Sequence, residues 1–322
     1  MTTEVRLQTP SVARAGMAKA APAASSGAAM RARFADGRWH FQHGPIDLII
    51  GADGEPAAVD GAVERTWSRF QGLLAELVGE LRILRSPVQE AGAVTGPVAR
   101  RMVGACFPHR ERFITPMAAV AGAVADELIG SFRDDPRIVR GYINNGGDIA
   151  LHLATGQSYK IGLCADLKRI KRREAHILDG DFQVTSGMPV RGIATSGWRG
   201  RSFSLGIADS VTVLARTAAA ADAAATMIAN SVNVEDPAIL RRPACELKDD
   251  TDLRDRLVTV AVGRLTTGQV QRALQAGMAS AREVTDRGLI YGAALWLQGV
   301  VGSVGCGGPD ESRWRGCDES ED

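Results

Sequence analysis

GIATSGWRGRSFSLGIADSVTVLARTAAAADAAATMIAN, residues 192–230, combines three local patterns that indicate how this chain folds. The first part ends in Ser196-Gly197, where a glycine lets backbone N–H groups approach a ligand closely. The β-branched run Ser210–Ala215 then predicts a strand that is buried on at least one face. The alanine run at 218–225 predicts a helix whose small side chains let it lie close to a neighbour or a ligand.

Asp222 is the one acid in this alanine run. On a helix, Asp222 and Thr226 lie one turn apart on the same face, so a carboxylate and a hydroxyl can reach the same point. Hard oxygen ligands in that geometry suit Mg²⁺, which takes one or two protein ligands and completes its shell with water or phosphate. The alternative, which the spacing alone favours, is that the Thr226 hydroxyl bonds back to the Asp222 carbonyl while the acid faces solvent.

The composition argues against several classes of protein. Its 38 basic and 37 acidic residues are balanced, so we expect no nucleic acid or membrane as a partner, and any anionic ligand must be held locally. The apolar stretches are broken well short of a membrane span. The five cysteines show no CxxC spacing, which argues against a disulfide framework or a zinc site. We therefore expect a cytoplasmic protein with a substantial core.

The order of the predicted elements is two strands, two helices and two strands, repeated more loosely from about residue 188. This order predicts an α+β fold with antiparallel sheets backed by helices. A Rossmann fold is not expected, because no GxGxxG motif follows a first strand. We expect disordered tails at 1–31 and 304–322 around one domain, 32–303, with sub-repeats at about 32–165 and 188–303.

Two further segments place polar groups where a ligand could bind. Residues 139–153 predict a strand, a tight Asn-Asn-Gly-Gly turn and a second strand. Gly146 and Gly147 can adopt positive φ and expose backbone amides, which suits a phosphate or a planar ring, although any kinked strand would use the same residues. Thr115-Pro116 predicts a helix start, with Thr115 as N-cap and Pro116 at the first helical position.

Three motifs, in this order along the chain, resemble the C-terminal half of the ApbE family of FAD:protein FMN transferases. They are the turn Thr-Ser-Gly at 195–197, the strand Ser-Val-Thr-Val that begins at Ser210, and the helical Ala-Asp-Ala-x-x-Thr around Asp222 and Thr226. In that family the aspartate and the threonine of the helix hold the divalent metal. The resemblance therefore implies that Asp222 and Thr226 bind Mg²⁺.

The first half of the chain carries two more matching segments. The helix MAAVAGAVADELI at 117–129 resembles a family motif, with Gly122 and Asp126 at matching positions, and segment 144–148 resembles the family's Asn-x-Gly-Gly-Asp/Asn-Ile. The resemblance implies a site for FAD or FMN as a dinucleotide-type ligand. The residues expected to line it are Thr115, Asn144, Asn145, Gly146, Gly147, Asp148, Thr195, Ser196 and Gly197.

The chain departs from the ApbE pattern at two places. The family lysine of the 117–129 helix falls on Ala121, and the family's His-containing loop is missing before Ser210. More specifically, the span from about residue 33 to 303 resembles UPF0280, a divergent branch of this superfamily. The resemblance implies a duplicated T-fold with β2α2β2 units.

Three functional hypotheses follow. The first is a Mg²⁺-dependent enzyme, a transferase acting on a phosphorus-containing group, with FAD as donor and a protein as acceptor. The second is a non-catalytic flavin or cofactor-binding protein, which the two missing features favour for protein flavinylation specifically. The third is a structural paralogue that binds no ligand. Homo-oligomerisation is left open by the sequence.

Overall fold

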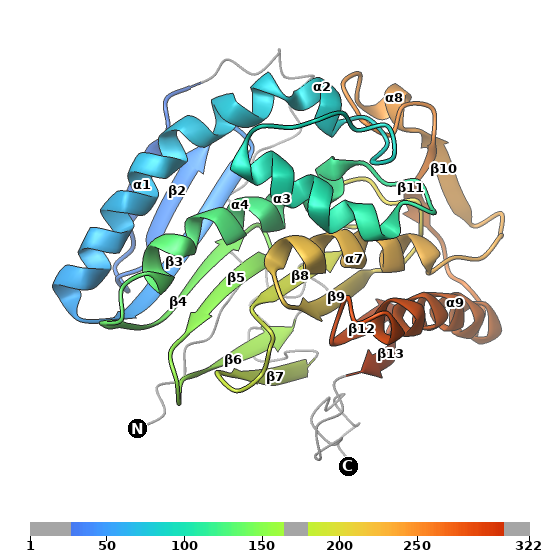
Figure 1. Cartoon of the computed structure of the whole chain (residues 1–322). Coiled ribbons are helices and arrows are strands. Elements are labelled where there is room, and N and C mark those ends of the chain that lie inside the picture. Colours follow the sequence, from blue (N-terminus) through green and yellow to red (C-terminus); the bar gives the residue numbers. More distant parts are fainter. Residues whose placement is uncertain (1–26, 164–179, 306–322) are drawn as a thin grey trace, which may run out of the picture.

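A nine-stranded antiparallel sheet with helices over one face is the framework of the computed structural model, which describes residues 27–163 and 180–305 (Figure 1). In their order across the sheet, the strands are β1 (Met30–Arg33), β2 (Trp39–His43), β3 (Ile46–Gly54), β4 (Ile138–Asn145), β5 (Asp148–Leu153), β8 (Gly192–Ser196), β9 (Ser210–Ala215), β12 (Gly292–Leu297) and β13 (Val300–Gly305). Two separate hairpins pair β6 (Ser158–Leu163) with β7 (Gly180–Thr185), and β10 (Ile239–Pro243) with β11 (Leu257–Val262). The predicted α+β class is confirmed.

The helices lie in the connections between the strands. The α-helices are α1 (Pro56–Gly79), α2 (Leu81–Leu84), α3 (Pro97–Cys106), α4 (Val120–Leu128), α5 (Gly130–Arg133), α7 (Ala218–Ser231), α8 (Ala244–Leu247) and α9 (Thr267–Asp286). Two short 3₁₀ helices, η1 (Phe107–His109) and η2 (Pro116–Ala119), lie between α3 and α4. Among the described helices, none is long and apolar enough to cross a membrane.

Successive side chains of a strand point to opposite faces of the sheet, and the buried residues therefore form clusters on both faces. Leu48 and Ile50 of β3 point into the core under the helices, whereas Ile49 between them joins a cluster on the opposite face. The β6–β7 hairpin covers that opposite face with Tyr159 and Ile161, both buried. On the helix side, α1, α3 and α4 cover the first half of the sheet, and α7 and α9 cover the second half (Figure 1).

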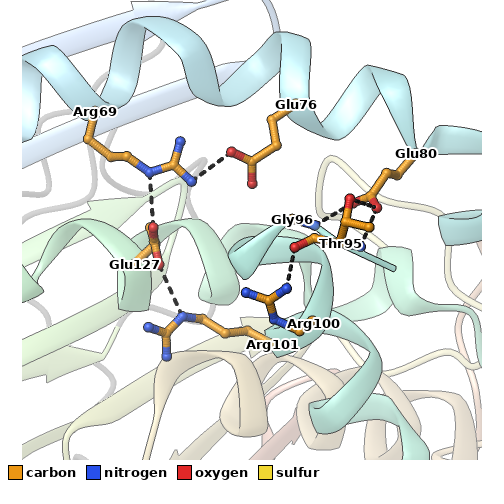
Figure 2. Close-up of polar contacts among 8 residues, drawn as sticks. All are labelled: Arg69, Glu76, Glu80, Thr95, Gly96, Arg100, Arg101 and Glu127. Carbon is orange, nitrogen blue, oxygen red and sulfur yellow. Dashed lines mark hydrogen bonds and ion pairs between the residues drawn. The ribbon is translucent and has the colours of Figure 1, made fainter. Parts of the chain in front are cut away.

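Ion pairs tie three helices of the first half together (Figure 2). Arg69 of α1 contacts Glu127 of α4 through Nε and Oε1 at 2.9 Å, and Glu76 of its own helix at 2.9 Å. Arg101 of α3 approaches the other oxygen of Glu127 at 3.3 Å. These contacts hold α4, which supplies Gly122 and Asp126, against its neighbours.

Most predicted elements are found where the sequence placed them. The Asp36-Gly37 sequence predicts a hairpin turn, and this turn joins β1 to β2. The sequence offers Thr266 or Thr267 as the cap of the helix that follows, and α9 has Thr266 as its N-cap, with a complete capping box. The apolar run 289–299 predicts a strand that Gly292 interrupts. In the structure β12 begins at Gly292, because Leu289 and Ile290 belong to the exit from α9 and pairing with β9 starts at Gly292.

The strands reach two residues beyond both expected domain boundaries. Met30 pairs with Gln42, and Gly305 pairs with Gly292, so backbone pairing sets both ends. The basic run at 168–173, and the tails before residue 27 and after residue 305, lie outside the described residues. The division into sub-repeats and the duplicated T-fold remain predictions.

Candidate functional site

The helices α4 and α7 cross at very short range, which explains why both are built from glycine and alanine. A Cβ added to Gly122 would lie 2.3 Å from the carbonyl oxygen of Ala218. No side chain fits at that distance, so only a glycine lets the start of α7 lie against α4. Gly122 is therefore required by packing.

Asp126 of α4 caps the N-terminus of α7. Its two carboxylate oxygens accept the N–H groups of Ala218 and Ala219 at 2.9 and 2.8 Å. Thr217, the N-cap residue, accepts the N–H of Ala220. Burial raises the pKa of Asp126, and the two amides act in the opposite direction.

Asp222 of α7 makes the reciprocal contact. Its Oδ2 accepts the N–H of Gly122, in the first turn of α4, at 3.0 Å. Burial raises the pKa of Asp222 well above its ordinary value, and the charge of Asp148 raises it further. The alternative to a metal site was that the Asp222 carboxylate faces solvent. In the structure Asp222 is half-buried and hydrogen-bonded to a neighbouring helix. Among the described contacts, the Thr226 hydroxyl makes no bond to the Asp222 carbonyl.

Asp148 begins β5 and brings the β4–β5 turn to this carboxylate. It is buried, and its Oδ1 accepts the N–H of Thr195 at 3.2 Å. Burial raises the pKa of Asp148 to about 7. The structure thus brings Asp148, Thr195 and Asp222 together, although they lie on three elements far apart in the sequence.

The Asn-Asn-Gly-Gly turn is held by its own asparagines. Asn144 Oδ1 accepts the N–H of Gly147 at 2.8 Å, and Asn145 Nδ2 donates to the carbonyl oxygen of Ala121 at 3.1 Å. Gly146 and Gly147 have φ of 68° and 120°, as predicted. The Asn145 bond anchors the turn to the start of α4. The next residue, Gly122, donates the N–H that Asp222 accepts.

The turn at 195–197 lies at the end of β8, next to Asp148. Thr195 is exposed, and its hydroxyl lies 2.9 Å from the hydroxyl of Thr212. Ser196 is half-buried. A Cβ at Gly197 would lie 2.4 Å from the carbonyl oxygen of Asp209, so close packing of the following loop requires this glycine.

Thr115 precedes η2, but its hydroxyl does not form the predicted helix cap. Pro116 occupies the first helical position as predicted, but Thr115 makes no side-chain cap bond. Its buried hydroxyl donates to Asp252 Oδ2 at 2.5 Å. The charges of Asp222 and Asp252 both act on the buried thiol of Cys106, and burial raises the pKa of that thiol well above its ordinary value.

The residues around Asp222 fit a hard cation. They offer two carboxylates and a half-buried threonine hydroxyl, all oxygen donors, and no ion pair joins Asp148 or Asp222 to another described residue. The described residues contain no group of three or more His, Cys, Asp or Glu side chains placed to hold a metal. The donor set therefore suits Mg²⁺, which keeps several waters, better than a transition metal.

A cavity of about 330 Å³ lies elsewhere, at the N-terminus of α7. Arg101, His109, Asp126 and Thr217 line it, and none of the residues predicted to bind flavin or metal does. Burial, together with Arg287 and Arg112, lowers the pKa of His109 to about 4, so this imidazole is neutral at pH 7. The cavity is separate from the carboxylate pair.

Comparison with known proteins places this chain in a family. Residues 31–305 match a family model described as AbpE bacteria. A UPF0280 protein of Methanothermobacter thermautotrophicus is 36% identical over 246 residues, which cover 72% of this chain and 87% of that protein. The chain belongs to the UPF0280 family, which is related to ApbE. The predicted family is confirmed.

Other matches are shorter or more distant. A UPF0280 protein of Methanopyrus kandleri is 36% identical over 156 residues, which cover 48% of this chain and 56% of that protein. Among solved structures, a variant of the flavin transferase ApbE from Vibrio cholerae shares 12% identity. That comparison has a TM-score of 0.43 and covers 86% of this chain and 96% of that one.

Proposed function

We propose that this UPF0280 protein binds a flavin dinucleotide together with Mg²⁺ between α4, α7 and the β4–β5 turn. The observation that supports the proposal is the pair of acids Asp148 and Asp222. Both have a raised pKa, so both are ionised only at a cost in free energy. No described ion pair involves either acid, and the one described cation whose charge acts on the pair is Arg201, which lowers the pKa of Asp148. A divalent cation would remove this cost, because it compensates both negative charges at once.

Each part of the site has a definite role in this proposal. Asp222 and Thr226 hold the metal, with Asp148 close by, and the glycine turn at 146–147 together with residues 195–197 lines the ligand. Bound Mg²⁺ supplies charge neutralisation for a pyrophosphate. The amides of Gly122 and Thr195 keep the two carboxylates in position. The flavin itself is inferred from family membership and from the sequence resemblance.

We propose transfer of FMN from FAD to a protein as the reaction of this site: the pyrophosphate linkage of FAD breaks, the FMN phosphorus bonds to the acceptor, and AMP leaves. A second candidate function is non-catalytic binding of the same ligand. Ala121 is the observation that favours this second candidate. Its carbonyl oxygen accepts a hydrogen bond from Asn145, so it lies at the site, but its side chain has no titratable group. The two candidates share the ligand and the metal, and differ only in turnover.

Calorimetry with FAD and FMN, in Mg²⁺ and in EDTA, tests the shared part. We expect FAD binding that requires Mg²⁺, and its loss in Asp222→Asn. Asp60→Asn is the matched control, because Asp60 is exposed on α1. FAD affinity that is equal in Mg²⁺ and EDTA, or unchanged in Asp222→Asn, would show that the metal assignment is wrong. Mass spectrometry of a candidate acceptor incubated with FAD then separates transfer from binding.

A further inference from the structure

We propose that Arg201 binds a phosphate group of the ligand at this site, and this inference rests on the proposed function. Arg201 lies in the loop between β8 and β9, which was not assigned a role from the sequence. Its guanidinium is placed over the β4–β5 turn, where its charge acts on Asp148. The chemical class that it selects is a phosphate monoester or a pyrophosphate.

The position of the guanidinium follows from the space above Gly146. A Cβ added to Gly146 would lie 1.7 Å from Nη2 of Arg201 and 2.7 Å from its Cζ. Gly146 therefore lacks a side chain for two reasons: its φ is positive, and the guanidinium occupies the space. The turn predicted to approach a ligand carries a cation directly on its surface.

The charge of Arg201 also acts on one acid of the site, Asp148. It lowers the pKa of this carboxyl, in opposition to burial. The next acid is Asp222, on which the charge of Asp148 acts. A phosphate bound between the guanidinium and a metal at Asp222 would contact one positive group on each side, the arrangement that stabilises a pyrophosphate.

The neighbouring Arg199 shows what an arginine with a structural role looks like in this loop. Arg199 Nε lies 2.9 Å from Asp209 Oδ1, and its guanidinium stacks on Trp198 with Cζ 5.0 Å from the ring centre. Arg201, by contrast, is exposed and makes no hydrogen bond or ion pair with any described residue. Its N–H donors are therefore available to a ligand, and a guanidinium binds phosphate oxygens in a bidentate manner.

Arg201→Gln and Arg199→Gln make a matched pair for a binding test. Inorganic pyrophosphate, FAD and riboflavin are titrated into each protein in Mg²⁺ by calorimetry. We expect Arg201→Gln to weaken pyrophosphate and FAD binding by about tenfold to a hundredfold, as loss of hydrogen bonds to a charged group does. Riboflavin, which has no phosphate, should change less than about threefold, because no charged hydrogen bond is lost. Arg199→Gln should leave all three affinities near those of the wild type.

Three results would overturn the assignment of Arg201. The first is unchanged pyrophosphate and FAD affinity in Arg201→Gln, and the second is an equal loss for riboflavin, which would indicate a counter-ion of Asp148 instead. The third is a wild-type protein that binds no pyrophosphate. If Asp222→Asn abolishes Mg²⁺-dependent FAD binding while Arg201→Gln has no effect, the proposed function stands and this inference fails. If pyrophosphate binding depends on Arg201 but FAD does not bind, the flavin proposal fails and the phosphate site stands.

Discussion

Asp126 and Asp222 occupy reciprocal positions at the crossing of α4 and α7, yet their surroundings differ in charge. Each belongs to one helix and accepts N–H groups from the first turn of the other. Asp126 has the cation Arg101 nearby, whereas Asp222 has a second acid, Asp148. Burial raises the pKa of both, but only the pKa of Asp222 is raised further by neighbouring acids, Asp148 and then Asp126.

We propose that this difference separates a carboxylate that caps a helix from one that binds a cation. Asp126 has both oxygens bonded to the amides that begin α7, so its negative charge is compensated by the helix terminus. The charge on Asp222 is compensated only in part, by the backbone amides of Gly122 and Ala121, and that on Asp148 by the amide of Thr195 and the charge of Arg201. Uncompensated buried charge is expected where a ligand supplies the missing partner. The following predictions test this contrast, from the largest expected effect to the smallest.

Substitution of Gly122 by valine should remove the crossing on which both acids depend. The new side chain would overlap the Ala218 carbonyl, so α4 and α7 would have to separate. We expect a loss of about 3 kcal/mol or more in the free energy of unfolding, or no folded protein. Urea denaturation measures this loss. Gly72→Val, at an open position on α1, is the control for inserting valine into a helix. Equal losses for the two variants would contradict the assigned role of Gly122.

Asp126→Asn should destabilise the protein without removing Mg²⁺-dependent binding. An amide group can accept only one of the two N–H groups of α7, and its NH₂ would face the other. We expect a loss of about 2 kcal/mol, the cost of a buried donor without a partner. Denaturation together with FAD calorimetry checks both parts. A variant as stable as the wild type would show that the α7 cap is unimportant.

The sequence predicted the elements of this site better than their contacts. The β-branched run of β9 and the alanines of α7 each specify local structure, so the conformational propensities of their residues predicted both elements. The approach of Asp148 to Asp222 depends on strand order across the sheet, which local patterns do not encode, and the sequence resemblance alone suggested it. Arg201 was missed for the same reason, because its partner Gly146 lies on another strand pair.

The sequence did not predict β13 or β10, and the reason in each case is local. The β12–β13 turn uses Gln298 and Gly299, both with positive φ, which is the geometry of a type I′ hairpin. Glutamine is unusual at the first position, so the signal was weak. β10 contains two arginines and a proline, Ile-Leu-Arg-Arg-Pro, and it pairs only with β11 at the edge of the fold.

The stability of the protein in EDTA should fall as the pH rises from about 5 to 8. The carboxyl pKa values of Asp148 and Asp222 are raised in the folded state, to about 7 for Asp148, from an unfolded value of 3.8. The folded state therefore binds more protons than the unfolded state between these values, and ionisation costs stability as the pH passes through the folded pKa. We expect a loss on the order of 1–2 kcal/mol.

Mg²⁺ should reverse this loss, because it binds only the folded protein with ionised acids. Thermal melting at pH 5, 6, 7 and 8, with EDTA and with Mg²⁺, measures the effect. His109 changes the stability of the protein in a different pH range. Because its pKa is lowered to about 4 in the folded state, the free energy of unfolding falls as the pH drops below about 6.5. Restricting the measurement to pH 7–8, above the ordinary pKa of His109, therefore isolates the acid pair. A flat profile over that range in EDTA would contradict the raised pKa values.

Asp222→Asn should have the smallest effect on stability and the opposite sign from Asp126→Asn. The asparagine oxygen can still accept the Gly122 N–H, and the substitution removes one of two negative charges that act on each other. We expect the variant to be as stable as the wild type at pH 8 in EDTA, or more stable by up to about 1 kcal/mol. Its pH dependence between 6 and 8 should be weaker, and Mg²⁺ should no longer raise its melting temperature. Urea denaturation at pH 6 and pH 8, with Asp60→Asn as the control, measures these differences. If Asp222→Asn instead destabilises the protein as much as Asp126→Asn, then both acids serve as helix caps, and the uncompensated charge at Asp222 has no role in binding a cation.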